Sequence, residues 1–100
     1  ARVVTWAGLA TGDTINPITP AHARPAIGTV TMEGTWGGST VVLEGSNDGT
    51  NYFTLKNPQG TAISATGDAL FEVSTAALYI RPGSSAGSGD SVNVILAMRG

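Results

Sequence analysis

The chain has 100 residues, a length that suits one domain with one modest hydrophobic core. Only 12% of the residues are charged, against roughly 25% in an ordinary soluble domain, so uncharged polar and small side chains must cover most of the surface. The net charge is −2 and the basic residues are scattered, so we do not expect nucleic acid as a partner, because non-specific binding requires several phosphates to be neutralised together. Cysteine is absent, which excludes disulfides and thiolate metal sites.

The first 26 residues are predicted to form an extended N-terminal arm. Residues 2–6 have the composition of a short strand, and another is predicted around Thr14 and Ile15. Between 7 and 26 the periodicity is broken by glycines and prolines, and proline cannot donate to a strand ladder. We expect this arm to lie across a neighbouring subunit, with a flexible terminal segment as the alternative. No apolar run approaches the roughly 20 residues of a membrane span, and the N-terminus lacks the apolar core of a signal peptide, so we expect no membrane partner.

The next segment, residues 27–33, alternates with period two and predicts a strand. Val30 and Met32 would face one way, and the threonines between them the other. The glycine pair at 37–38 then turns the chain. Trp36, within that turn, is interpreted as a lid over one edge of the core, with an exposed contact residue as the alternative.

Residues 39–55 predict a β-hairpin around which the rest of the chain can be arranged. Residues 40–45 alternate and are rich in β-branched side chains, which is typical of a strand. Residues 46–51 carry a dense turn signal, in which Gly49 supplies the positive φ that tight turns require. Residues 52–55 resume a strand.

The remaining segments complete the predicted fold. A turn at 56–60 leads to short strands at 61–64 and 68–74, the second with one helical turn as the alternative, and to a strand at 78–82 that ends at a proline. The Gly/Ser tract 83–90 is predicted to be a mobile surface loop. The last strand, 91–99, would place four residues in the core, namely Val92, Val94, Leu96 and Met98. Short strands at a spacing of roughly 8–12 residues, without a helical pattern, indicate an all-β fold: a small antiparallel β-sandwich over residues 27–100, immunoglobulin-like or jelly-roll-like.

No constellation of residues for catalysis or metal binding is found. His22 is the single histidine and no nucleophile motif accompanies it, so we expect no catalytic residue and no enzyme. If Gly49 is aligned with the glycine of an EF-hand loop, Leu55 falls where the bidentate glutamate is required. A looser cation site at Asp48 is the alternative to an ordinary hydrogen-bonded turn. We therefore expect no cofactor and no metal.

The segment Leu43–Leu55 is similar to a hairpin of discoidin (coagulation factor C-type) domains, in which a Ser-x-Asp-Gly turn precedes an aromatic and a hydrophobic residue. Those domains bind sugars or lipid head groups on a β-sandwich. They are longer than this chain, and the terminal cysteines they carry are absent here.

A wider pattern resembles small structural proteins of tailed bacteriophages, in particular capsid decoration, or cement, proteins. It comprises residues 27–55, where Gly-Thr-Val-Thr-Met-Glu-Gly leads into the hairpin, and residues 78–82, followed by a Gly/Ser loop and a strand ending in Arg99. The resemblance implies a protein on the outer surface of the capsid that bridges neighbouring capsomers and resists the internal DNA pressure. The implied partner is the major capsid protein, and the implied location is the virion, after assembly in the host cytoplasm.

Contacts between subunits are expected to use large side chains of the arm, with two further candidates outside it; together these are Trp6, Ile15, Ile18, Arg24, Trp36 and Arg81. We also expect a homo-oligomer, either a dimer or a trimer. One alternative is a carbohydrate-binding module in which Trp36 and Tyr52 stack on sugar rings near the turn at 47–51. Another is a phage tail or baseplate accessory protein.

Overall fold

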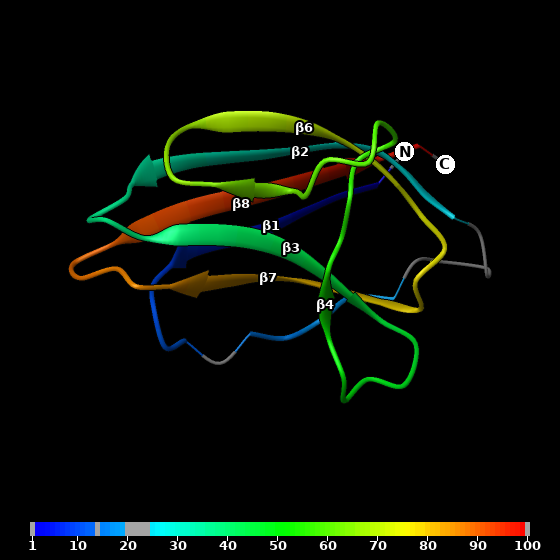
Figure 1. Cartoon of the computed structure of the whole chain (residues 1–100), viewed down its shortest axis with the longest axis horizontal. Helices are drawn as coiled ribbons and strands as arrows, with labels where there is room; N and C mark the ends of the chain where they lie inside the picture. Colours follow the sequence, from blue (N-terminus) through cyan, green and yellow to red (C-terminus); the bar gives the residue numbers. More distant parts are fainter. Residues whose placement is uncertain (1, 14, 20–24, 100) are drawn as a thin grey trace.

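The computed structural model describes residues 2–13, 15–19 and 25–99, and these form a sandwich of two β-sheets (Figure 1). Eight strands make up the sheets, every strand pairing is antiparallel, and the described residues contain no helix. The all-β antiparallel sandwich predicted from the sequence is therefore confirmed.

The first sheet has the strand order β1-β8-β2-β6. Its strands are β1 (Arg2–Leu9), β8 (Ser91–Met98), β2 (Ala26–Thr35) and β6 (Ala69–Thr75). The last strand of the chain thus lies between the first and the second. This order brings the two ends of the chain into one sheet, and it leaves β1 and β6 as the outer strands.

The second sheet is built on β3 (Thr40–Ser46). β7 (Tyr79–Ser85) pairs with β3 over its whole length, from one end to the other. β4 (Phe53–Thr54) and β5 (Ser64–Ala65) therefore share the opposite edge of β3, where β4 pairs with residues 44–45 and β5 with residues 41–42. The pairing of β3 with β4 confirms the predicted hairpin, and β5 lies slightly later than the short strand predicted at 61–64.

The core lies between the two sheets and consists of alternate residues of their strands. In a strand, successive side chains point to opposite faces, so one face of each strand is buried. In β8 the predicted core residues are all buried, and Val92, Val94 and Leu96 are completely inaccessible. Side chains with no exposed surface also come from β2, β3, β7 and the segment before β5, namely Val30, Met32, Val41, Leu43, Ile63 and Ile80.

β7 does not end at Pro82, as the sequence analysis predicts, but continues to Ser85. The strand can continue because the residue opposite Pro82, which is Leu43 of β3, directs its backbone N–H and C=O groups away from β7. The N–H of Leu43 donates to Ile63 (3.1 Å) and its carbonyl accepts from Leu55 (2.8 Å), both on the other edge of β3. Leu43 and Pro82 thus form a non-hydrogen-bonded pair, and the proline has no ladder bond to lose.

The Gly/Ser tract is also more ordered in structure than the predicted surface loop. Residues 83–85 belong to β7, because their backbones pair with residues 40–42 of β3 whatever their side chains are. The rest of the tract turns back toward β8, and the N–H of Ser88 donates to the carbonyl of Gly37 (3.1 Å) in the neighbouring turn.

The segment predicted as an N-terminal arm is divided into two parts. Residues 2–9 form β1, which pairs with β8 and has a register shift between Trp6 and Leu9. These residues therefore belong to the sandwich and do not form a separate arm. Residues 15–19 cross to the second sheet, where Ile18 and Ile80 of β7 exchange two backbone hydrogen bonds of 2.8 and 2.9 Å. Ile15 lies outside any strand, and Thr14 is outside the described residues.

We expect the substitution Gly28→Ala to unfold the protein or to destabilise it by about 3 kcal/mol or more. A Cβ on Gly28 of β2 would overlap the backbone carbonyl of Ala97 in β8, so the two central strands of the first sheet would have to separate. Urea denaturation measures the change. Gly67→Ala is the matched control, because a Cβ there meets open space and the expected change is within about 0.5 kcal/mol. Equal losses in the two variants would contradict the described packing of β2 against β8.

Candidate functional site

An open groove of about 510 Å³ lies at the end of the sandwich where the β3–β4 hairpin turns. Gly45, Leu55 and Ala77 line its apolar part, and Phe53 and the turn residues line the rest. A Cβ on Gly45 would lie 2.7 Å from Cδ2 of Leu55 and 3.0 Å from Cβ of Ala77, so glycine allows these two side chains to close over the end of β3. We call this region, residues 45–55 with 77 and 78, the hairpin end.

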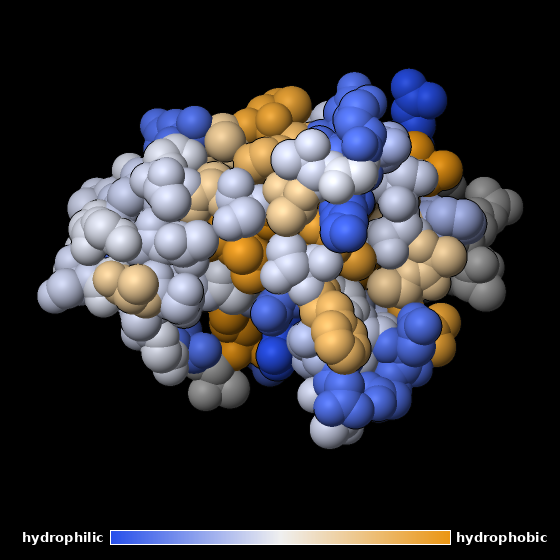
Figure 2. Space-filling model, in the orientation of Figure 1, coloured by the Kyte–Doolittle hydropathy of each residue, from blue (hydrophilic) through white to orange (hydrophobic). Residues whose placement is uncertain are grey.

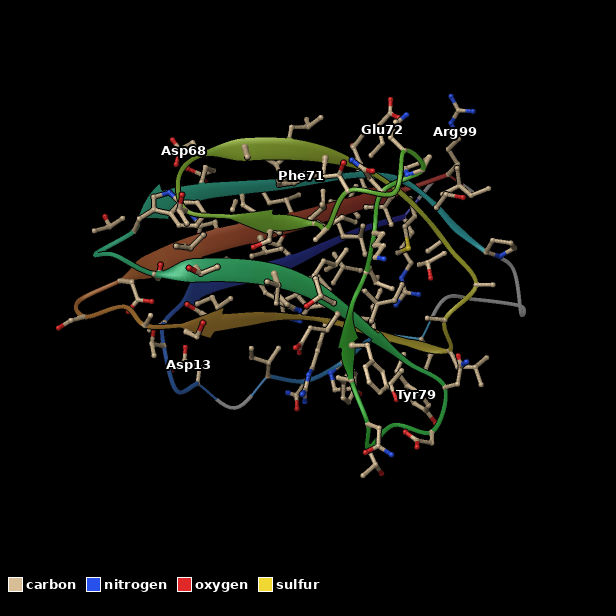
Figure 3. All side chains as sticks on the ribbon, viewed as in Figure 1. Asp13, Asp68, Phe71, Glu72, Tyr79 and Arg99 are labelled. Carbon is tan, nitrogen blue, oxygen red and sulfur yellow. The ribbon has the colours of Figure 1, made fainter. Side chains whose placement is uncertain are left out.

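The turn of the hairpin is organised by the carboxylate of Asp48. Its Oδ1 accepts hydrogen bonds from the backbone N–H groups of Asn51 and Thr50 (both 2.8 Å) and from the hydroxyl of Ser46 (2.9 Å), and its Oδ2 accepts from Nδ2 of Asn51 (2.9 Å). These bonds, above all the one from the Asn51 backbone, hold the pKa of Asp48 well below its usual range. Gly49 has a φ of 77°, as a tight turn requires, and the ring of Tyr79 lies against it (Figure 3).

This geometry is that of a hydrogen-bonded turn, which the sequence analysis gave as the ordinary explanation for Asp48. Within residues 2–13, 15–19 and 25–99, His, Cys, Asp and Glu side chains form no group of three or more that could hold a metal ion.

Two apolar side chains project from the hairpin end into solvent. Phe53 is 73% exposed and lies opposite Gly45 on β3. Leu78 is 52% exposed, and its N–H donates to Oδ1 of Asn47 (3.3 Å) in the turn. Sequence reasoning did not single out either residue. The sequence places Phe53 in the second strand of the hairpin, but only the register of β3 and β4 sets it opposite Gly45, where the partner strand provides no side chain to cover its ring.

Arg81, a predicted partner-binding residue, is held by its own chain. Its Nε donates to Oε1 of Glu44 (3.1 Å), directly opposite in the register of β3 and β7, and its guanidinium carbon lies 3.6 Å from the ring centroid of Tyr52. The ion pair and the cation–π contact stabilise each other's geometry. One face of the Tyr52 ring is thus covered by a cation and is not free to stack on a sugar.

Trp36 lies at the other end of β3. It packs against the core, in agreement with its interpretation as a lid, and its Nε1 donates to Oδ1 of Asp68 (2.8 Å). This hydrogen bond, with a second from the N–H of Gly34, lowers the pKa of Asp68. Trp36 precedes β3 and Tyr52 follows the turn at its opposite end, and the six residue steps of β3 span about 20 Å at about 3.3 Å per residue. The structure therefore does not bring the two aromatic residues together, and the predicted sugar platform is wrong in this detail.

The remaining predicted contact residues lie in the segment that runs from β1 to β7. Trp6, Ile15 and Ile18 are partly buried and pack against the core of their own chain. Nε1 of Trp6 donates to the carbonyl of Asn16 (3.0 Å), which fixes the ring against the segment 15–19. Arg24 and His22 lie outside the described residues. Partner binding by these residues stays a prediction.

Asp90, which the sequence analysis did not single out, connects three parts of the chain. It is 8% exposed, and its Oδ2 accepts hydrogen bonds from the N–H and hydroxyl of Thr11 (2.9 and 3.0 Å) and from the hydroxyl of Ser84 (3.1 Å). Burial opposes ionisation of the carboxyl, but the hydrogen bonds outweigh it and lower the pKa of Asp90. The loop after β1, the end of β7 and the start of β8 are thereby joined.

Figure 2 shows hydrophobic residues at several separate places on the visible face, including a patch over β6, among largely neutral and hydrophilic ones. The large apolar side chains with the greatest exposure come from both sheets and the hairpin end: Val3, Ile27, Phe53, Leu70 and Leu78.

Comparison of the chain with protein-family models, curated proteins and solved structures finds no match. In the part of the chain that the structure describes, no helix has the length and apolar character needed to cross a membrane.

The substitution Asp90→Asn should lower stability at neutral pH and should also weaken the dependence of stability on acid. A carboxyl whose pKa is lowered by folding contributes stability above its ordinary pKa of about 4, and this contribution is lost as the pH falls toward the folded value. Thermal unfolding measured from neutral pH to below pH 4 should show the wild type and the variant converging in acid. Glu72→Gln is the control, because its exposed carboxylate accepts no hydrogen bond from the described residues. A deficit in Asp90→Asn that is the same at all pH values would contradict this account.

Proposed function

We propose that this chain is a structural protein that binds other protein subunits, and that it does so on the outer surface of a phage capsid, where it stabilises contacts between capsomers. The observation that carries the binding role is Phe53, an aromatic side chain that is 73% exposed beside an apolar groove. The capsid as the place of action rests on the sequence resemblance to decoration proteins.

The exposure of Phe53 matters because the fold gains nothing from it. Its strand, β4, has two residues, and its ring takes no part in the core. Transfer of such a side chain from water into a protein interface contributes about 1.5–3 kcal/mol. Aromatic residues that fill a partner's pocket are typical of the few positions that dominate binding energy.

The low charge of the chain also favours contact with protein. Interface centres are depleted of charged residues, because desolvating an unpaired charge is costly. Here 12% of the residues are charged, and at the hairpin end the carboxylate of Asp48 is already surrounded by hydrogen-bond donors of its own turn. A partner that covers this end would therefore leave few polar groups unsatisfied.

The mechanism is mass action. A protein that binds the mature shell and not its ruptured form stabilises the shell in proportion to the logarithm of its free concentration over the dissociation constant. Icosahedral repetition of the site adds avidity if one oligomer reaches two capsomers at once. No bond is made or broken in this account.

Carbohydrate binding is the second candidate. The volume of the groove, about 510 Å³, lies in the range of ligand sites, and Phe53 with Asn47 and Asn51 forms part of its lining. On a glycan array, specific binding that is lost in Phe53→Ala would support this candidate and count against the first. Binding to purified tails in place of heads would indicate a tail or baseplate component.

Removal of the whole predicted arm is not a clean test of the capsid proposal. Deleting residues 1–25 would remove β1 and expose the edge of β8, so a loss of binding would not distinguish a lost contact from a damaged sheet. Point substitutions of exposed side chains avoid this problem.

The substitution Phe53→Ser should weaken binding to empty shells of the cognate major capsid protein at least about tenfold, because the apolar contribution of the ring is lost. Its free energy of unfolding should stay within about 0.5 kcal/mol of the wild type, since the ring is outside the core. Co-sedimentation over a concentration series measures the affinity, with Gln59→Ser on the exposed turn after β4 as the matched control. Wild-type affinity in Phe53→Ser would exclude the hairpin end as the contact surface.

A further inference from the structure

Both outer strands of the first sheet have a free edge within the described residues. β6 pairs with β2 alone, and β1 pairs with β8 alone. In the second sheet, by contrast, the outer edge of β7 is partly covered by the backbone bridge from Ile18 to Ile80. Uncovered edges present unpaired N–H and C=O groups, which an extended polypeptide can satisfy.

The free backbone groups of β6 can be assigned to particular residues. The N–H of Arg99 donates to the carbonyl of Ile27 (2.8 Å), so Ile27 directs its backbone toward β8. Because successive residues of an antiparallel strand alternate in direction, Gly28 and Val30 bond to β6, opposite Val73 and Phe71. The residues of β6 that alternate with Val73 and Phe71 are Leu70, Glu72 and Ser74, and they direct their N–H and C=O groups away from β2. No described residue bonds to these groups.

The same alternation identifies the free groups of β1. Met98 and Leu96 of β8 bond to their partners Arg2 and Val4, which leaves Val3 and Thr5 pointing outward. The segment 15–19 contacts β1 through the side chains of Arg2 and Trp6, which belong to the other alternating set. Val3 remains 64% exposed.

The two edges match in direction and in the face their side chains occupy. The strands of the first sheet alternate in direction, so β1 of a second molecule placed along β6 would continue the antiparallel order. The rows Val3–Ala97–Thr29–Glu72 and Thr5–Ile95–Thr31–Leu70 run across the sheet on its outer face. The outward-bonding residues of both edges therefore carry their side chains on that same face, where Val3 and Leu70 are 64% and 63% exposed.

Charge favours this pairing over pairing of β6 with itself. In the longest antiparallel register of two β6 strands, Glu72 would stand opposite Glu72 of the second molecule, and like charges directly opposite destabilise a sheet. Figure 3 shows Glu72 projecting outward from the sheet. The outward-bonding residues of β1, Val3 and Thr5, are uncharged, so they bring no second carboxylate next to it.

We propose that the free edge of β6 takes β1 of a second copy of this chain as an additional antiparallel strand, so that the protein associates head to tail. Such an interface uses different surfaces on the two molecules and builds a closed ring or an open row. It deepens the proposed function by giving the oligomer a defined interface, but it is measured without a capsid. Failure of shell binding and failure of self-association are thus separate results.

Proline substitutions test each edge separately. In Glu72→Pro and Thr5→Pro the lost N–H is one that points outward, so the ladders to β2 and β8 keep their bonds, while the ring obstructs an approaching strand. Light scattering after size exclusion, over concentrations up to about 1 mM, should show self-association of the wild type and at least about tenfold weaker association of either variant. Glu72→Gln and Thr5→Ser keep the N–H and should associate as the wild type does. Circular dichroism checks that all four variants are folded.

Mixing the two proline variants distinguishes head-to-tail pairing from other modes. Thr5→Pro keeps an intact β6 edge and Glu72→Pro an intact β1 edge, so together they should form a complex of one molecule of each that grows no further. Complexes of Thr5→Pro with itself would indicate β6–β6 pairing and would overturn the proposal.

Amide hydrogen exchange of the wild type provides a test that needs no variant. As the concentration rises, exchange should slow at Leu70, Glu72 and Ser74 together with Val3 and Thr5, and should not change at the exposed turn 57–60. A wild type that is monomeric up to about 1 mM, or protection of one edge without the other, would overturn the proposal.

Discussion

The insertion of β8 between β1 and β2 is the contact on which the rest of the structure depends. β8 bonds to a neighbour along both edges and buries Val92, Val94 and Leu96 completely, so it is the central element of the first sheet although it comes after the other strands in sequence order. Gly28 permits β2 to lie close enough to β8, because any larger side chain would overlap the backbone there. With no disulfide available, this long-range pairing and the apolar layer beneath it hold the sandwich together.

Two consequences for function follow from this arrangement. First, β1 and β6 become the outer strands of the first sheet, and their free edges are suited to pairing between copies. Second, the β3–β4 hairpin extends beyond the core at one end of the second sheet, where Phe53 is exposed beside an apolar groove. Three charged side chains, those of Asp48, Asp90 and Arg81, are bonded within the chain. In the proposed function, a partner contacts backbone edges and apolar side chains of this charge-poor chain.

The sequence predicted the strands whose two faces differ, and it failed where backbone pairing decides the structure. The alternation in 27–33, 40–45 and 91–99 was sufficient, because burial of one face imposes period two. The predicted strand ended too early, at Pro82, because only the pairing of Pro82 with Leu43 shows that this position of β7 needs no backbone N–H. The arm was misjudged because the partner of β1 lies at the far end of the sequence. At the hairpin end, the turn was recognised from Asp48 and Gly49, but the exposure of Phe53 depends on Gly45 across the ladder, and the distance between Trp36 and Tyr52 depends on the length of β3.

The central claim is that this chain attaches to a protein shell through its hairpin end. Cryo-electron microscopy of empty shells of the cognate capsid protein, incubated with the purified chain, tests it most directly. The account predicts density for the sandwich on the outer surface at junctions between capsomers, with Phe53 turned toward the shell and neighbouring copies joined from β6 to β1. Shells that carry no additional density, or a bound sandwich whose hairpin end faces solvent, would contradict it.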